Sequence, residues 1–297
     1  MKPKIVAIVG PTASGKSDLA VVVAKKFNGE VISADSRQVY KGLDIGTGKI
    51  TKKEMRGVPH HLLDVANPKT QFSVDKYKEL ADKAITNILA KGRIPILCGG
   101  TGFYVDAVAK NISLPNVPPN PKLRKILAKK SASTLFTMLR KLDPNRAKSI
   151  QKENKVRLIR ALEICKSIGH VPHLEVEPPS KYEVLYIGIL WKPRIHKEKI
   201  RARLLKRMNK GMIAEAKRLH KQGLSWKRMH ALGLEYHYLA LYLQKQISKN
   251  EMIEKLNSSI WHYAKRQMTW FKRNKDIVWM DPQKKSVILK VIQKFLK

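Results

Sequence analysis

The sequence contains little cysteine and no long hydrophobic segment. Its 297 residues include only two cysteines, Cys98 and Cys165, and neither belongs to a Cys/His spacing that would indicate a zinc site. We therefore expect two buried thiols. No apolar run approaches the length of a membrane span, and the first expected strand begins so close to Met1 that no room remains for a signal peptide. These features predict a cytoplasmic protein that does not interact with a membrane.

Acidic residues are also scarce. The chain has 23 Asp and Glu against 60 Lys and Arg, a formal net charge of +37. The excess is uneven, because residues 1–113 hold 18 basic and 10 acidic residues whereas residues 114–297 hold 42 and 13. Lys and Arg contacts to phosphates supply most sequence-independent affinity for nucleic acids, so the asymmetry favours a polyanion bound mainly by the second region. The alternative is a set of solvated basic faces in a lysine-rich protein.

The start of the chain carries a phosphate-binding pattern. Residues 5–9 (IVAIV) are typical of a buried parallel strand, and residues 10–17 (GPTASGKS) match G-x-x-x-x-G-K-[ST] before a stretch that suits a helix. In such a loop the glycines let backbone N–H groups surround an anion, Lys16 reaches its outer oxygens and Ser17 can hold Mg²⁺. A Gly/Ser turn that matches by chance is the alternative. The pattern leaves open whether the phosphates belong to a nucleotide.

Two further strand ends are expected beside this loop. The strand VISA (31–34) delivers Asp35 to the carboxyl edge of the sheet, where ligands bind in open parallel α/β folds. Asp35 could act there as a base, a metal partner or a ribose clamp, or it could cap the following turn. Residues 93–109 form a second strand–glycine loop–helix unit, which brings the Thr101 hydroxyl to the same edge unless its glycines only make a tight turn. No acidic residue ends the strand IPILC, so the aspartate with which ATP-hydrolysing phosphate-loop proteins help to hold Mg²⁺ is not evident.

Proline and glycine mark the boundaries and loops. Proline-rich breaks at 113–121 and 170–181 bracket a series of helical patterns. We therefore predict a helical insertion domain over residues 115–181, facing the nucleic acid, within a core formed by residues 1–114 and 182–297. A flexible, substrate-facing loop is predicted by three glycines, Gly42, Gly46 and Gly48.

The core resumes after the insertion with a strand over 182–191. A long basic helix is expected over 195–223, with two glycines as possible breaks, and a last short strand over 276–280. Between them, residues 234–272 mix aromatic residues with cations at helical spacing, and we expect most aromatics inside and the cations outside. The predicted fold is α/β: a phosphate-loop core with a parallel sheet and helices on both faces, plus a small all-helical insertion.

One stripe of an insertion helix carries Asn154, Arg157 and Arg160 at i, i+3 and i+6, as either a solvated basic face or a nucleic-acid-facing surface.

In combination, these stretches resemble the tRNA dimethylallyltransferase family. The resemblance covers nearly the whole chain and lacks the zinc-binding extension of eukaryotic members, which implies the bacterial type. The sequence departs from the family pattern at Gln151, where a histidine is expected, and at GLEY, which replaces the commoner GYKE type. The matching stretches are GPTASGKS (10–17), SADSRQVYKGLDIGTGK (33–49), GVPHHLLD (57–64), GRIPILCGGTGFY (92–104), DPNRA (143–147), NKVRLIRALE (154–163), GLEY (233–236) and YAKRQMTWF (263–271).

The resemblance implies a reaction and a set of site residues. The family transfers a dimethylallyl group from dimethylallyl diphosphate to the exocyclic amine of the adenine 3′ of the anticodon, releasing pyrophosphate. Asp35 is implied as the general base, Thr101 and Arg203 as groups that hold the diphosphate, and Ser17 as a ligand of Mg²⁺. Arg201 and Arg207 are neighbouring alternatives to Arg203. The implied diphosphate-binding loop residues are Gly10, Thr12, Ala13, Ser14, Gly15, Lys16 and Ser17, and the implied tRNA-binding residues are Ser36, Arg37, Gln38, Asn154, Arg157, Arg160, Lys265 and Arg266.

Physical chemistry agrees with this reaction. The adenine amine is a poor nucleophile, so removing its proton during attack lowers the barrier, and cations stabilise the charge that develops on the leaving pyrophosphate. No γ-phosphate is cleaved, which explains a phosphate loop without an evident ATPase acid. The alternatives are a small-molecule kinase, transfer of the same group to free AMP, which the basic charge of residues 114–297 argues against, and a non-enzymatic RNA-binding adaptor. With no extended apolar face evident, we expect a monomer.

Overall fold

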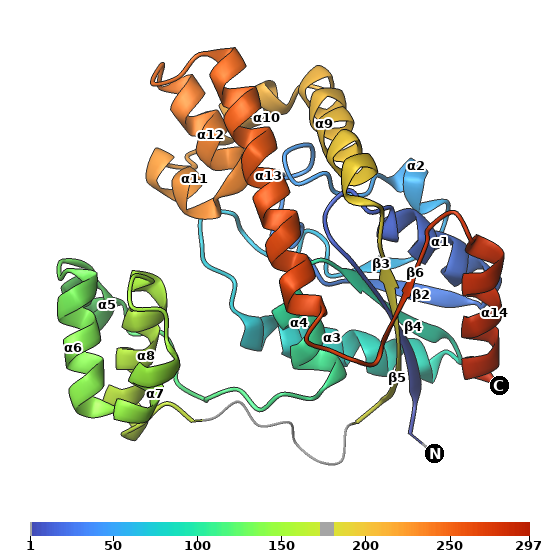
Figure 1. Cartoon of the computed structure of the whole chain (residues 1–297), viewed down its shortest axis with the longest axis horizontal. Coiled ribbons are helices and arrows are strands. Elements are labelled where there is room, and N and C mark those ends of the chain that lie inside the picture. The colour runs from blue at the N-terminus through green and yellow to red at the C-terminus, as the bar shows by residue number, and fades with distance from the viewer. Residues whose placement is uncertain (1, 173–180) are drawn as a thin grey trace. The chain divides into compact units, whose positions relative to one another are not determined.

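A computed structural model describes residues 2–172 and 181–297 of the chain (Figure 1). The chain divides into two compact units, one formed by residues 1–111 and 178–297 and the other by residues 112–177. The first unit contains a six-stranded sheet in the order β3-β2-β4-β1-β5-β6, with every strand pairing parallel. The α/β prediction with a parallel sheet is therefore confirmed. The strands are β1 (Lys4–Val9), β2 (Gly29–Ser33), β3 (His60–His61), β4 (Ile94–Gly99), β5 (Glu183–Ile189) and β6 (Ile277–Met280).

The helices of the first unit cover both faces of this sheet (Figure 1). They are α1 (Lys16–Lys26), α2 (Lys52–Met55), α3 (Val74–Ala90), α4 (Gly102–Ala109), α9 (Pro193–Asn209), α10 (Met212–Lys221), α11 (Trp226–Leu232), α12 (Leu234–Leu243), α13 (Lys249–Phe271) and α14 (Lys285–Leu296). Because side chains alternate along a strand, Val6 and Ile8 of β1 pack in a core with α1 and α14, whereas Ile5, Ala7 and Val9 pack in a second core with α3 and α4. The central strand is buried on both faces, as its continuous apolar sequence predicts.

Strand register brings the functional loops together. Val9 of β1 pairs with Gly99 of β4 and with Gly188 of β5, and Ser33 of β2 pairs with Cys98 of β4. These strands therefore end at the same level, and the segments that follow them meet at one edge of the sheet.

The helices after β5 differ from the sequence expectation in two respects. The basic helix expected over 195–223 is divided at Gly211, which has φ +95° and caps the start of α10, so one of the two glycines is the break. Of the aromatic residues between 234 and 272, Tyr236 and Phe271 are buried, but Trp261, Tyr263 and Trp270, like Tyr238 and Tyr242, are only half-buried. The expectation that most of them lie inside is therefore only partly right, because Tyr263 lines a cavity and the rings of Trp261 and Trp270 lie beneath cations.

The second unit is all helical and has its own core. It consists of α5 (Pro121–Ala128), α6 (Ala132–Leu142), α7 (Pro144–Ser149) and α8 (Lys155–Ile168). Each helix begins at a residue whose side chain accepts a hydrogen bond from the first turn, and these caps are Asn120, Ser131, Asp143 and Asn154. Leu135, Leu139 and Leu158 are fully buried among the apolar faces of these helices. The predicted connector over 170–181 falls largely on residues outside the described ranges.

Candidate active site

Two glycines allow the backbone conformation of the loop between β1 and α1. Gly10 has φ +151°, and a Cβ there would lie 2.8 Å from the carbonyl oxygen of Ile189. Gly15 has φ +91° and precedes the first residue of α1, Lys16. The indole Nε1 of Trp191 donates to the carbonyl oxygen of Ser14 over 2.9 Å, which fixes the loop against the end of β5. The N–H groups in the first turn of α1 therefore lie at the carboxyl edge of the sheet, where they attract anions.

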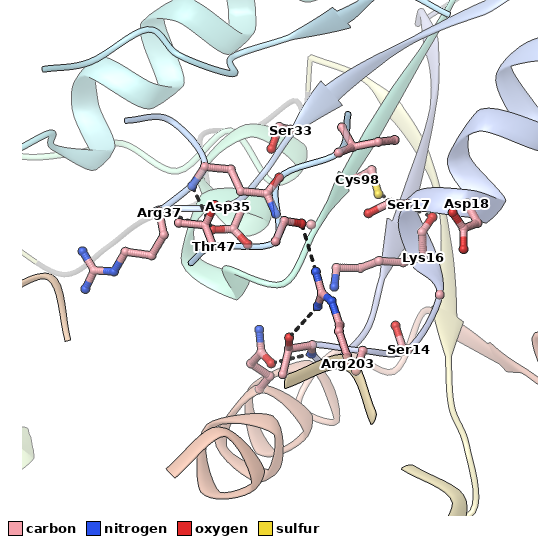
Figure 2. A pocket seen from close by; sticks show the side chains of 18 of the residues that line it. Ser14, Lys16, Ser17, Asp18, Ser33, Asp35, Arg37, Thr47, Cys98 and Arg203 are labelled. Atoms are coloured by element: carbon pink, nitrogen blue, oxygen red, sulfur yellow. Dashed lines mark hydrogen bonds between the residues drawn. The ribbon is translucent and has the colours of Figure 1, made fainter. Parts of the chain in front are cut away.

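Two cations converge beside this loop. Lys16 Nζ donates to the carbonyl oxygen of Pro11 over 3.2 Å, and Arg203 in α9 donates from Nη1 to Thr12 Oγ1 over 3.1 Å and from Nη2 to the Gly48 carbonyl over 3.0 Å. Burial lowers the pKa of Lys16, and the nearby charge of Arg203 lowers it further, although Cys98 and Asp35 act in the opposite direction. Burial and the charge of Arg207 likewise lower the pKa of Arg203. Figure 2 shows both side chains directed into the same space, where an anion would relieve their repulsion.

Geometry separates Arg203 from its two neighbours. Arg201 is exposed and pairs with Glu254 over 3.1 Å. Arg207 is buried, donates to the Gly46 carbonyl over 2.6 Å and pairs with Glu235 over 2.9 Å. Of these three arginines, Arg203 alone lines the cavity described below. The arginine implied by the family resemblance is thus the one with access to a ligand.

Asp35 and Thr101 lie at the ends of neighbouring strands. Asp35 Oδ1 accepts hydrogen bonds from the N–H groups of Arg37 (2.8 Å) and Gln38 (3.3 Å), so the capping role considered from the sequence is present. Within residues 2–172 and 181–297, Oδ2 of Asp35 makes no hydrogen bond and can accept a proton. Thr101 Oγ1 accepts from the N–H of Ser36 over 3.0 Å, which joins the segments after β2 and β4. The glycine turn also allows a close approach, because a Cβ at Gly99 would overlap the Ala34 carbonyl.

Sequence reasoning missed two site residues on α13. Gln267 is 6% exposed, accepts from the Thr12 N–H over 2.8 Å and donates to the Gly100 carbonyl over 2.7 Å, so it bridges the phosphate loop and the second glycine turn. One turn earlier, the Tyr263 hydroxyl is hydrogen-bonded to Thr101, and burial together with Asp35 raises the pKa of Tyr263 to about 12. The usable signal is spacing, because Tyr263, Gln267 and Trp270 recur at i, i+4 and i+7 and therefore share one helix face.

These groups surround a cavity of about 1060 Å³ at the carboxyl edge of the sheet. Asp35 and Arg203 line it together with Tyr263 and Gln267. Among the other residues implied from the sequence, Gly10, Thr101 and Lys265 contact cavity residues or neighbour them in the chain without lining the cavity themselves. The implied residues that do line it, beyond Asp35 and Arg203, are Thr12, Ala13, Ser14, Gly15, Lys16, Ser17, Ser36, Arg37, Gln38 and Arg266.

Three residues of the helical unit are implied as tRNA contacts, and they differ in how strongly their side chains are bound to other residues of that unit. Asn154 caps α8, since its side chain accepts from the Arg157 N–H over 3.1 Å. Arg160 pairs with the buried Glu163 over 2.6 Å. Arg157 is exposed and makes a 3.3 Å hydrogen bond to Gln151, so its guanidinium is the most accessible of the three polar groups.

Oxygen donors suited to Mg²⁺ border the cavity, but they do not form a complete metal site. Ser17 and Asp35 both line it, as does Asp18. Among the described residues no group of three or more His, Cys, Asp or Glu side chains could hold a metal ion. Mg²⁺ commonly binds through one or two protein oxygens, substrate phosphates and water, so the donor set fits an ion that arrives with a diphosphate.

The sheet, the glycine-rich loop and the cavity at the carboxyl edge define an α/β protein built to hold an anionic ligand beside a carboxylate. Residues 38–274 match the family model described as IPP transferase. The chain is 43% identical over 271 residues to tRNA dimethylallyltransferase 2 of Citrifermentans bemidjiense, covering 91% of this chain and 87% of that protein. It is 41% identical over 290 residues to tRNA dimethylallyltransferase of Halalkalibacterium halodurans, covering 95% and 92%.

Solved structures agree with the sequence comparisons. The full-length tRNA isopentenylpyrophosphate transferase of Bacillus halodurans matches 99% of this chain and 96% of its own length, with a TM-score of 0.75 and 38% identity. A eukaryotic dimethylallyltransferase captured acting on tRNA matches 94% of this chain and 74% of its own, with a TM-score of 0.81 and 26% identity. The chain belongs to the IPP transferase family, a family of prenyl-transferring enzymes, which confirms the resemblance drawn from its motifs. In the described ranges no helix has the length and apolar character needed to cross a membrane.

Proposed function

We propose that this protein transfers a dimethylallyl group from dimethylallyl diphosphate to the exocyclic amine of the adenine 3′ of the anticodon in tRNA, releasing pyrophosphate. The observation that carries the proposal is the convergence of the phosphate loop, two cations and the Asp35 carboxylate on one cavity. Family membership over most of the chain supports the same reaction.

The diphosphate is proposed to bind at the loop of residues 10–17. Backbone N–H groups at the start of α1, Lys16 Nζ and the Arg203 guanidinium would neutralise its charge. Burial lowers the pKa of both cations, the charge of Arg203 lowers that of Lys16 further, and the charge of Arg207 lowers that of Arg203, so an anion between them is favoured. As the bond between the allylic carbon and oxygen breaks, its electron pair leaves with pyrophosphate, and the same groups stabilise the developing charge. The Thr101 hydroxyl is proposed to help hold the leaving group.

Asp35 is proposed to take the proton from the adenine amine. The amine nitrogen forms a bond to the allylic carbon while its proton passes to Asp35 Oδ2, the oxygen that the turn does not use. The N–H groups of Arg37 and Gln38 hold Oδ1 and so orient the carboxylate. The base has to leave the anticodon stack to reach Asp35, and a cavity of about 1060 Å³ has room for it beside the donor.

Mg²⁺ is proposed as a companion of the diphosphate, with the Ser17 hydroxyl as its protein ligand. The ion would add positive charge at the leaving oxygens. The role of the chain itself is to present Ser17 at the start of α1, within the lining of the cavity.

Binding of tRNA is proposed to involve both units, each through its own residues. Ser36, Arg37, Gln38 and Arg266 line the cavity in the first unit, and Lys265 is exposed beside Arg266. In the second unit Arg157 is the most accessible cation of the predicted stripe. We propose that a monomer suffices, because one chain supplies every group of the reaction site, and that the reaction takes place in the cytoplasm with its tRNA substrate.

The experiment is mass spectrometry of unmodified tRNA after incubation with the protein, Mg²⁺ and dimethylallyl diphosphate. The expected result is the mass of one dimethylallyl group on the nucleotide 3′ of the anticodon, with an equal amount of pyrophosphate. Pyrophosphate formed with free AMP and not with tRNA would contradict the proposal. Formation of ADP from ATP and a small acceptor, without prenylated tRNA, would point to a kinase instead.

A further inference from the structure

The glycine loop after β2 is held by a buried carboxylate that the reaction described above does not use. Glu215 in α10 is 3% exposed. Its Oε2 accepts from the N–H groups of Asp44 (3.0 Å) and Ile45 (2.7 Å), and its Oε1 accepts from that of Gly46 (2.8 Å). Three successive N–H groups therefore surround one carboxylate, as backbone nests do around anions.

A tyrosine completes this arrangement. The Tyr236 hydroxyl donates to Glu215 Oε1 over 2.8 Å, and its ring leaves no room for a side chain at Gly46, where a Cβ would lie 2.7 Å from it. Burial and the charge of Glu215 raise the pKa of Tyr236, so the hydroxyl stays protonated and keeps donating. Among the described residues Glu215 forms no ion pair, and its charge is met by these four hydrogen bonds.

The carbonyl groups of the same loop point to two arginines. The Gly46 carbonyl accepts from Arg207 over 2.6 Å, and the Gly48 carbonyl accepts from Arg203 Nη2 over 3.0 Å. Thr47 and Gly48 line the cavity, as does Arg203. The loop thus connects Glu215, which lies away from the cavity, to the guanidinium that faces it.

We propose that Glu215 is a positioning residue of the diphosphate site. By holding the N–H groups of residues 44–46, it fixes the Gly48 carbonyl, which sets the direction of the Arg203 guanidinium toward the phosphate loop. Without Glu215 three N–H groups lose their acceptor, the loop relaxes, and Arg203 loses one of its two hydrogen bonds. This inference rests on the proposed binding of a diphosphate between Lys16 and Arg203.

The test measures inorganic pyrophosphate binding to the full chain with Mg²⁺ and without tRNA, by isothermal titration calorimetry. Glu215→Gln keeps the side-chain shape but replaces one acceptor oxygen by an amide NH2 group, which can only donate, and we expect its affinity for pyrophosphate to fall about tenfold. Tyr236→Phe removes only one of the four hydrogen bonds and should weaken binding about threefold. Glu254→Gln, which alters only an exposed ion pair with Arg201 on α9, is the matched control and should bind as the wild type does.

A second readout separates positioning from general damage. Amide hydrogen exchange should accelerate at residues 44–46 in Glu215→Gln, while the amides of β1 and β4 keep their protection and tRNA affinity stays within about twofold of the wild type. Faster exchange at residues 44–46 with unchanged pyrophosphate affinity would overturn the inference, as would an equal loss of tRNA affinity. If Glu215→Gln does not fold, Tyr236→Phe decides by the same two measurements. A wild-type protein that does not bind pyrophosphate would overturn the diphosphate site itself, whereas wild-type binding that Glu215→Gln retains in full would overturn the positioning role alone.

Discussion

The two units of the chain hold their polar groups in different ways. In the sheet-containing unit the hydrogen bonds that shape the cavity join distant residues: Thr12 and Gln267 are 255 positions apart, and Thr12 and Arg203 are 191 apart. In the helical unit the caps of α6, α7 and α8 bond to residues three positions away. The difference teaches that the reaction site depends on closure of the whole first unit, whereas the helical unit closes within a short segment, where the hydrogen bond from the Asn120 N–H to Glu163 spans 43 positions. Substitutions in the two units should therefore have separable effects.

The largest effect is expected at Asp35. In Asp35→Asn the amide oxygen can still accept from the N–H groups of Arg37 and Gln38, so the turn persists, but no carboxylate is left to take the proton. We expect prenyl transfer to fall by about 10²- to 10⁴-fold while tRNA binding is unchanged. Single-turnover transfer and tRNA filter binding check this, with Asp75→Asn, at an exposed position in the first turn of α3, as a control for the loss of one charge. Normal turnover in Asp35→Asn would remove Asp35 from the role of base.

The next effect distinguishes neighbouring arginines on α9. Arg203→Ala removes a donor from the cavity, and we expect kcat/KM for dimethylallyl diphosphate to fall about 10²-fold. Arg201→Ala should change it less than about twofold, because Arg201 is exposed and pairs with Glu254 outside the cavity lining. Steady-state kinetics with varied donor and saturating tRNA make the comparison. Equal losses of kcat/KM in the two variants would mean that the donor depends on the overall positive charge of α9 and not on the position of Arg203.

A third prediction concerns acid stability of the helical unit. Burial alone would raise the pKa of Glu163, but hydrogen bonds from Arg124, the Asn120 N–H and Arg160 hold it at about 2, below its ordinary value of 4.5. Because the folded state binds the proton less readily than the unfolded state, this stabilisation is present above pH 4.5 and is lost as the pH falls toward 2. Glu163→Gln should lower the free energy of unfolding of this unit at pH 7 by about 2 kcal/mol and flatten its dependence on pH in that window.

Hydrogen exchange of α5–α8 at several pH values measures that stability, and pyrophosphate binding serves as the control for the first unit. The comparison of the two units would fail if Glu163→Gln weakened pyrophosphate binding as much as it weakened the helical unit.

The smallest effect is expected at Arg157. Losing a single exposed phosphate contact in Arg157→Ala should lower the affinity for tRNA a few-fold. It should also reduce the slope of log affinity against log salt concentration by about 1. Arg160→Ala should reduce the slope less, because Glu163 already engages that guanidinium. Lys83→Ala on α3 is the charge-matched control. A slope that does not change in Arg157→Ala would remove this stripe from the tRNA interface.

The strands and the loops at their ends could be predicted from the sequence, because a run of apolar residues or a glycine determines the backbone conformation of the few residues around it. The strand before Asp35 and the glycine turn around Thr101 were predicted from a few adjacent residues each. The choice among Arg201, Arg203 and Arg207 could not be made by periodicity, because all three lie on one basic helix, and it came from the family resemblance.

The roles of Gln267 and Tyr263 in the site were not predicted from the sequence, for a related reason. Their partners, Thr12, Gly100 and Thr101, lie far earlier in the chain, and a glutamine on a helix looks locally like any solvated residue. Their spacing places them on one face of α13, but the packing of α13 against the sheet is needed to show that this face borders the phosphate loop. The same holds for Glu215, whose three N–H partners are about 170 positions away.

The bridge made by Gln267 also sets the order in which the site can form during synthesis. The phosphate loop is synthesised well before the acceptor for its Thr12 N–H, because Gln267 of α13 follows 255 positions later. A growing chain thus carries the glycine loop without its bridge until α13 has emerged. Premature termination before α13 would leave a nascent protein with the phosphate-binding sequence but no completed cavity to occupy.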